Sequence, residues 1–218
     1  MKKAKPFPSI VVCYYDMEEI ERQNPKELAQ RCCGEIVVLC RHIGDLTELL
    51  IDATRKKDIA DAVRLCELYY EDAIMRIYSL RDRAFDTLGA LVGIPRNKKR
   101  FRDEVLAELE IKQPELKKVF DTLIKLIDTD LKHRNVTTHQ TLIFLGVSFT
   151  DDFSDISEVG SMLLWSDPDS NEGQALQATV RKALKSFVTQ KNKHLKEIIS
   201  QAHEFAQLSR EAIDKKAW

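Results

Sequence analysis

The longest helical pattern in the chain is DIADAVRLCELYYEDAIMRIYSLRDRAFDTLGALVG (residues 58–93). Its apolar side chains recur every three or four residues, which places them on one side of an α-helix. They are Ile59, Val63, Cys66, Tyr70, Ile77, Leu80, Ala84, Leu88 and Leu91. The pattern begins at Asp58, and Gly93 and Pro95 supply typical stop signals behind it. The stretch therefore predicts one long helix, from Asp58 to Leu91, with one buried side.

The residues before this stretch predict another helix. Asn24 is a residue type that caps a helix, Pro25 suits the first helical position, and Glu27 follows at the third. Apolar residues then recur at helical spacing to about residue 53. They are Cys32, Ile36, Leu39, Cys40, Ile43, Leu46 and Leu50.

Three more helices are expected farther along the chain. They cover Phe101–Ile111, a range that begins at Pro114, and a range from about Asn171 to Asp214. In the last helix the apolar stripe is diluted at KNKH (191–194), where we expect a bend or an exposed stretch. Residues 1–23 are interpreted as an N-terminal extension and residues 141–169 as an irregular segment.

Long helices joined by short links predict an all-α fold: an up-and-down bundle of long antiparallel helices, with residues 1–218 in one domain. Hydrophobic residues make up 44% of the chain and charged residues 32%, which fits a soluble globular protein and argues against disorder. The net charge is -1, so any surface for a nucleic acid must be local.

The cysteines and the N-terminal residues bear on the compartment. Five cysteines, two of them adjacent, fit a reduced cytoplasmic chain in which most of them fill the core. The first residues hold lysines but only a short apolar run, so neither a signal peptide nor a membrane span is expected. The histidines and cysteines lack metal-ligand spacing, and no glycine-rich phosphate loop occurs. We therefore expect no metal, no cofactor and no membrane partner.

Two arginines fall on the apolar sides of their helices. At about 100° per residue, Arg134 continues one inward line and Arg81 lies on another. The apolar residues are Leu123, Ile127 and Leu131 on the line of Arg134, and Val63, Tyr70, Ile74 and Leu88 on the line of Arg81. An unpaired guanidinium in a core is strongly unfavourable, so each arginine needs a partner, a wet cleft or an interface. Two alternatives stay open: pairing with a carboxylate, such as the neighbouring Asp82 or Asp86, or a helix that ends before Arg134.

The segment RNVTTH (134–139) combines an arginine and a histidine. Arginine holds phosphate bidentately and stabilises charge that builds on it, while histidine exchanges a proton near neutral pH. RNA supplies its own nucleophile, the 2′-hydroxyl, so no metal is required. On one unbroken helix Arg134 and His139 lie about 140° apart. For joint work the helix must end or bend at the β-branched run 136–138, or the two residues must come from symmetry-related copies.

RNVTTH resembles the Arg-x(4–6)-His signature of the HEPN superfamily, in which a polar residue, often asparagine, follows the arginine as Asn135 does here. The stretch YSLRDRAFDTLGALVG (78–93) also resembles the long helix that faces this motif in such proteins. The resemblance covers about residues 25–150 and part of the last helix. It implies a compact helical bundle that dimerises, and many members are metal-independent ribonucleases of toxin–antitoxin or other defence systems.

The resemblance assigns roles to particular residues. Arg134 and His139 would be catalytic, Asn135 would orient them, and Arg81 would line the cleft. The basic segment PRNKKRFR (95–102) is a candidate RNA contact, although Asp103 and Glu104 could balance its charge. Its candidate substrate-binding residues are Arg96, Lys98, Lys99, Arg100 and Arg102.

One departure and one alternative limit this interpretation. HEPN toxins that a nucleotidyltransferase silences often carry a tyrosine two positions after the histidine, and Thr141 stands there instead. Modification by such a partner is therefore not expected, although an antitoxin or another protein partner stays open. The alternative function is a catalytically inactive HEPN-like helical module that binds a nucleotide or a protein.

Overall fold

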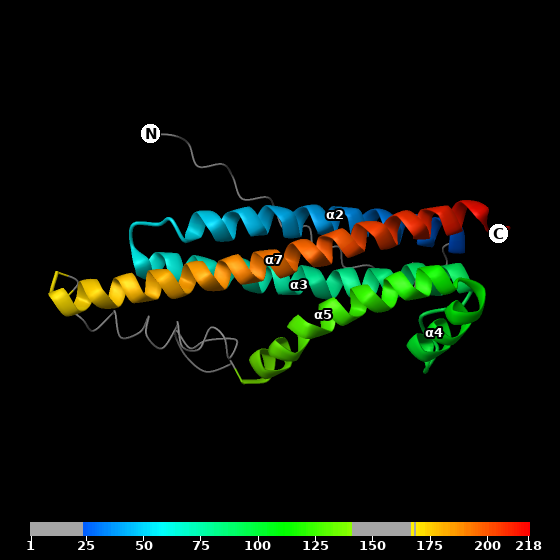
Figure 1. Ribbon diagram of the computed structural model, residues 1–218. Helices are drawn as coiled ribbons and strands as arrows, with labels where there is room; N and C mark the ends of the chain where they lie inside the picture. Colours follow the sequence, from blue (N-terminus) through cyan, green and yellow to red (C-terminus); the bar gives the residue numbers. More distant parts are fainter. Residues whose placement is uncertain (1–23, 141–166, 168) are drawn as a thin grey trace.

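The computed structural model describes residues 24–140, 167 and 169–218, and over residues 130–140 it describes the helical backbone alone. Its helices are α2 (Pro25–Ala53), α3 (Ile59–Val92), α4 (Phe101–Lys112), α5 (Pro114–Gln140) and α7 (Asn171–Lys215) (Figure 1). The predicted all-α bundle is confirmed for the described residues. The expected irregular segment and N-terminal extension lie almost entirely outside them.

The helices begin and end where local side chains set their boundaries. The Asn24 side chain accepts a hydrogen bond from the Lys26 backbone N–H at 3.0 Å, and Asp58 accepts one from the Ala60 N–H at 2.8 Å. Gly93 ends α3 with a φ of 79°, a left-handed conformation that glycine adopts without a side-chain clash. The boundaries expected for these helices are therefore confirmed to within one or two residues.

Helix α7 lies along α2, and hydrogen bonds join the two helices at two separate points. The Cys33 thiol, near the start of α2, donates to the Ala206 carbonyl at 3.2 Å. The Asn192 amide donates to the Thr47 carbonyl at 3.0 Å, nearer the end of α2. Residue numbers rise along α2 as they fall along α7, so the two helices run in opposite directions. Figure 1 shows α3 and α5 packed on the same bundle, with α4 at one end.

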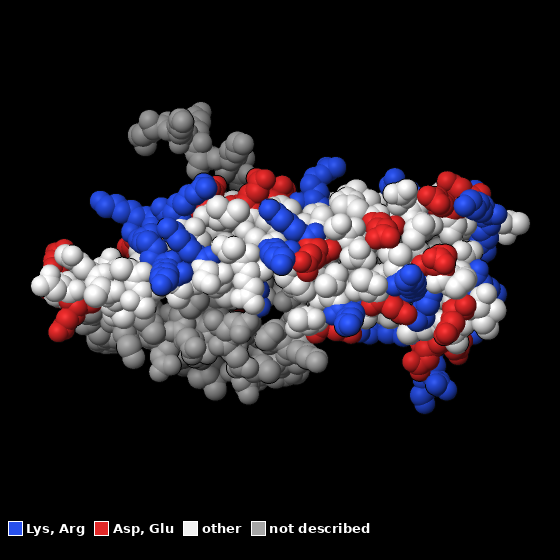
Figure 2. Space-filling model, in the orientation of Figure 1, with Lys and Arg blue, Asp and Glu red and all other residues white. Residues whose placement is uncertain are grey.

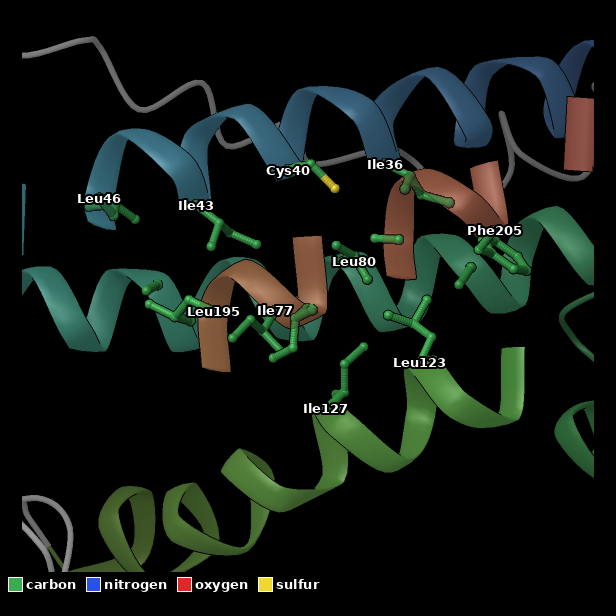
Figure 3. Close-up of a cluster of buried hydrophobic side chains, with 14 of the residues drawn as sticks. Ile36, Cys40, Ile43, Leu46, Ile77, Leu80, Leu123, Ile127, Leu195 and Phe205 are labelled. Atoms are coloured by element: carbon green, nitrogen blue, oxygen red, sulfur yellow. The ribbon is translucent and has the colours of Figure 1, made fainter. Parts of the chain in front are cut away.

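Apolar side chains from α2, α3, α5 and α7 meet in one core (Figure 3). Phe120 of α5 is 1% exposed and joins Phe85 of α3 to Phe205 of α7, with ring centroids 4.9 and 5.8 Å apart. Leu123 and Ile127 are fully buried, which confirms the inward line expected for α5. Aromatic contacts of this kind stabilise the packing beyond the burial of apolar area.

The described cysteines fill this core as free thiols. They are Cys32, Cys33, Cys40 and Cys66. Burial raises the pKa of the Cys40 thiol to about 12, so at neutral pH this thiol is protonated and unreactive. Cys13 lies outside the described residues.

The expectation for KNKH is wrong for half of the segment. Helix α7 continues through residues 191–194, and Lys191 and Asn192 are buried, at 7% and 6% exposure. The Lys191 ammonium lies 5.4 Å from the Tyr70 ring centroid and 5.7 Å from that of Phe187. Cation–π contacts offset the lost hydration of Lys191, and the hydrogen bond to α2 offsets that of the Asn192 amide nitrogen. Asn192 Oδ1 is buried without a hydrogen-bond partner among the described residues. Lys193 is exposed, as expected.

Within the part of the chain that the structure describes, none of the helices combines the length and the apolar character needed to cross a membrane.

Candidate functional site

Helix α5 carries the RNVTTH segment without a break. It runs from Pro114 to Gln140, so the alternative in which the helix ends before Arg134 is wrong. Val136, Thr137 and Thr138 each weaken a helix by only a fraction of about 1 kcal/mol. A helix that is already several turns long extends readily, because its costly nucleus has formed. The β-branched run therefore does not end α5.

The unbroken backbone constrains how the motif could work. Positions 134 and 139 lie about 140° apart around the axis of α5, so one copy of the helix presents them on different faces. Position 134 continues the inward line of Leu123 and Ile127. The side chains of Arg134, Asn135 and His139 lie outside the described part of the chain. If α5 is straight here, a site that uses both Arg134 and His139 needs two copies of α5.

Arg81 of α3 finds its carboxylate on α5. Its Nη1 lies 3.4 Å from Asp128 Oδ1, and the two side chains are 23% and 47% exposed. Its Nε atom is buried without a hydrogen-bond partner among the described residues. The expected carboxylate partner is present, but it is neither Asp82 nor Asp86. The ion pair instead joins α3 to the helix that carries RNVTTH.

The basic segment at residues 95–102 is largely neutralised within the chain. Each of four cations has an acidic partner. The pairs are Arg96–Asp86 at 2.8 Å, Lys98–Glu104 at 2.9 Å, Arg100–Asp103 at 3.3 Å and Arg102–Asp82 at 3.2 Å. Lys99 alone of the five proposed substrate-binding residues is exposed without an ion pair among the described residues. The balance expected from Asp103 and Glu104 is thus present, and Asp82 and Asp86 extend it.

Asp86, at 6% exposure, is a buried carboxylate that pairs with both Arg96 and Arg83. Its carboxylate accepts from Arg96 Nη1 at 2.8 Å and from Arg83 Nη1 at 3.0 Å, and Arg83 also contacts Glu35 of α2 at 2.8 Å. Burial raises the pKa of Asp86, although Arg96 and Arg83 both lower it. Desolvation therefore outweighs the two arginines. The network ties α2, α3 and the α3–α4 connection together.

Two glutamates on α3 were missed from the sequence. Burial raises the pKa of Glu67 and of Glu71, and the charge of Glu71 raises that of Glu67 further. Glu67 Oε1 is buried without a hydrogen-bond partner among the described residues. Carboxylates with raised pKa values are suited to proton transfer near neutral pH. The available signal was the position of Glu67, which lies on the line of Val63 and Ile74 at helical spacing.

Metal binding gains no support from the described residues. No group of three histidine, cysteine, aspartate or glutamate side chains among them is arranged to hold a metal ion.

Comparisons of the chain with protein-family models, with curated proteins and with solved structures found no match. The likeness to the HEPN superfamily therefore stays a prediction, based on RNVTTH and on the helices around it.

Proposed function

We propose that the chain is a HEPN-type endoribonuclease that cleaves single-stranded RNA without a metal ion and acts as a homodimer. Its helices would have the up-and-down antiparallel order of that superfamily. The observation that supports this proposal most is the position of RNVTTH in the last two turns of α5. There, position 134 continues the buried line of the helix, and the Arg81–Asp128 pair links α5 to α3.

The proposed reaction needs groups that this segment contains. The RNA 2′-hydroxyl attacks the adjacent phosphorus, the bond from phosphorus to the 5′-oxygen breaks, and a 2′,3′-cyclic phosphate and a 5′-hydroxyl result. His139 would exchange the proton, since an imidazole titrates near neutral pH. Arg134 would stabilise the negative charge on the phosphorane. Asn135 would orient the pair, and Arg81 would add a second cation on the α3 side.

The geometry of α5 makes the dimer part of the proposal. Because positions 134 and 139 face different sides of one helix, Arg134 of one protomer would act with His139 of its partner. A solution mass measurement tests this requirement directly. A monomer at the protein concentration of an active assay would contradict the shared site.

The experiment for cleavage uses purified chain, single-stranded RNA and excess EDTA. Arg134→Ala and His139→Ala are each expected to lower the rate at least about a hundredfold, the usual contribution of such groups. His203→Ala is the matched control, because His203 is an exposed histidine on α7. Its cleavage rate should equal that of the unmodified chain. Equal cleavage by all variants, or none by any, would refute the nuclease proposal.

A second candidate is a catalytically inactive helical module that binds a protein or a nucleotide. The neutralised cations favour it, because Arg81 and four of the five proposed RNA contacts already have carboxylate partners. This candidate predicts no turnover and a lower Tm for Arg134→Ala, since truncation would remove a structural ion pair. An active-site arginine instead leaves stability unchanged or improved when it is truncated.

A further inference from the structure

A basic surface at the opposite end of the bundle from α4 lies outside every motif singled out above. It consists of Arg55, Lys56 and Lys57 in the α2–α3 connection and Arg181, Lys182 and Lys185 of α7, and we call it the end patch. Figure 2 shows lysine and arginine side chains gathered there. Helix α7 supplies no opposing charge nearby, because residues 173–196 contain six lysines and arginines and no acidic residue.

Arg181 fixes the two parts of the end patch against each other. Its Nη1 donates to the Lys56 carbonyl at 2.8 Å, and its Nη2 donates to the Lys57 carbonyl at 2.8 Å. A longer contact of 3.5 Å reaches the Thr54 carbonyl at the end of α2. The backbone of the connection is therefore held on α7, and less conformational entropy is lost when the lysines bind a ligand.

Nearby acidic residues leave most of this charge uncompensated. Asp52 pairs with Arg55 at 2.9 Å, and both side chains are largely exposed. Asp58 accepts hydrogen bonds from the first N–H groups of α3. The four lysines of the end patch are exposed and have no ion pair among the described residues. They are Lys56, Lys57, Lys182 and Lys185. The segment at residues 95–102 differs, because four of its cations have acidic partners.

We propose that the end patch binds the sugar-phosphate backbone of single-stranded RNA and holds the strand near the end of α5. The choice of RNA as occupant rests on the proposed function. Phosphate contacts by lysines position a strand without reading its sequence, and the end patch contains no aromatic residue on which a base could stack. Helix α5 runs toward the same end of the bundle (Figure 1).

Membrane lipid fits the end patch less well. Surface-bound helices combine cations with an apolar side that enters the lipid. The exposed neighbours of Lys182 and Lys185 on α7 are instead polar or small: Ser186, Thr189, Gln190 and Ala178.

The test measures binding of labelled single-stranded RNA to the full chain by fluorescence anisotropy, in a His139→Ala background that prevents cleavage. The patch variant combines Lys56→Gln, Lys182→Gln and Lys185→Gln. The matched control combines Lys118→Gln, Lys125→Gln and Lys215→Gln, which remove the same charge from exposed positions elsewhere. Circular dichroism verifies that both variants keep the helix content of the parent chain.

The patch variant should raise Kd about tenfold and lower the slope of log Kd against log salt by about 2, because three phosphate contacts are lost. The control should bind like the parent. Equal Kd values for the two variants would overturn the proposal, as would absent RNA binding by the parent chain. Stronger binding to phosphatidylserine vesicles or to polyglutamate than to RNA would also overturn it, in favour of a lipid or an acidic protein.

Cleavage assays separate this inference from the proposed function. If RNA binding depends on the end patch but the chain with its native His139 does not cleave RNA, the nuclease proposal is refuted and the end-patch proposal stands. If the patch variant cleaves RNA with an unchanged KM, the end-patch proposal is refuted and the nuclease proposal stands.

Discussion

Replacing Asp86 by alanine removes the carboxylate at the centre of the ion network. Arg83, which is 19% exposed, would keep its contact to Glu35, and Arg96, which is 35% exposed, would keep the 4.0 Å contact to Asp82. Removing one partner of a buried ion pair costs about 3–5 kcal/mol. Both arginines retain a second carboxylate, and desolvation already opposes the charge on Asp86. We therefore expect a loss of about 2–3 kcal/mol in the free energy of unfolding, at or below the lower end of that range.

Thermal and urea unfolding, followed by circular dichroism at neutral pH, measure this loss. For a chain of this size about 1 kcal/mol corresponds to 2–4 °C, so Tm should fall by about 4–12 °C. Asp103→Ala is the control, because its pair with Arg100 is 68–75% exposed and should contribute less than about 1 kcal/mol. A loss for Asp86→Ala no larger than that of the control would refute the reasoning that the buried network stabilises the bundle.

Three further changes test other features. Glu67→Gln should raise Tm at neutral pH, because the raised pKa of Glu67 means that the folded chain binds its proton more tightly than the unfolded chain. The ionised carboxylate therefore lowers the stability of the fold as pH rises above the unfolded pKa. The rise in Tm should vanish in melts at acid pH, and a rise that does not depend on pH would contradict this reasoning. Gly89→Ala should lower the free energy of unfolding in urea by about 1–3 kcal/mol, because the added Cβ would lie 2.5 Å from the Phe101 ring and 3.0 Å from the Ile94 carbonyl oxygen. Gly44→Ala, where a Cβ meets nothing within 4 Å, should instead stabilise by about 0.5–1 kcal/mol, and equal effects at the two glycines would show that the close approach to Phe101 is irrelevant.

Helix boundaries were predictable because their causes are local. Asn24 and Asp58 cap helices within three residues, and Gly93 supplies the left-handed conformation at its own position. The buried line of α5 followed from the spacing of Leu123 and Ile127. Each of these features depends on interactions within one turn, and a sequence records such interactions directly.

Partners of charged residues were harder to predict because they come from distant parts of the chain. Asp128 rather than Asp82 neutralises Arg81, since Asp82 contacts Arg102 of α4 and lies 4.0 Å from Arg96 in the α3–α4 connection. The burial of Lys191 likewise depends on Tyr70 of α3, which no pattern within α7 records. For Arg134 and His139, the spacing set their angle on an unbroken helix, while the continuity of α5 came only with the structure.

The bond from Cys33 to Ala206 spans 173 residues of sequence, and it has a consequence for how the protein forms. During synthesis, α2 emerges together with α3 but long before α7, so the part of its apolar side that packs against α7 stays uncovered until the last quarter of the chain is made. Loops of that size close late, and folding slows as contacts become less local. A chain without α7 would leave that apolar surface exposed to water, which favours aggregation or chaperone binding until α7 has been made.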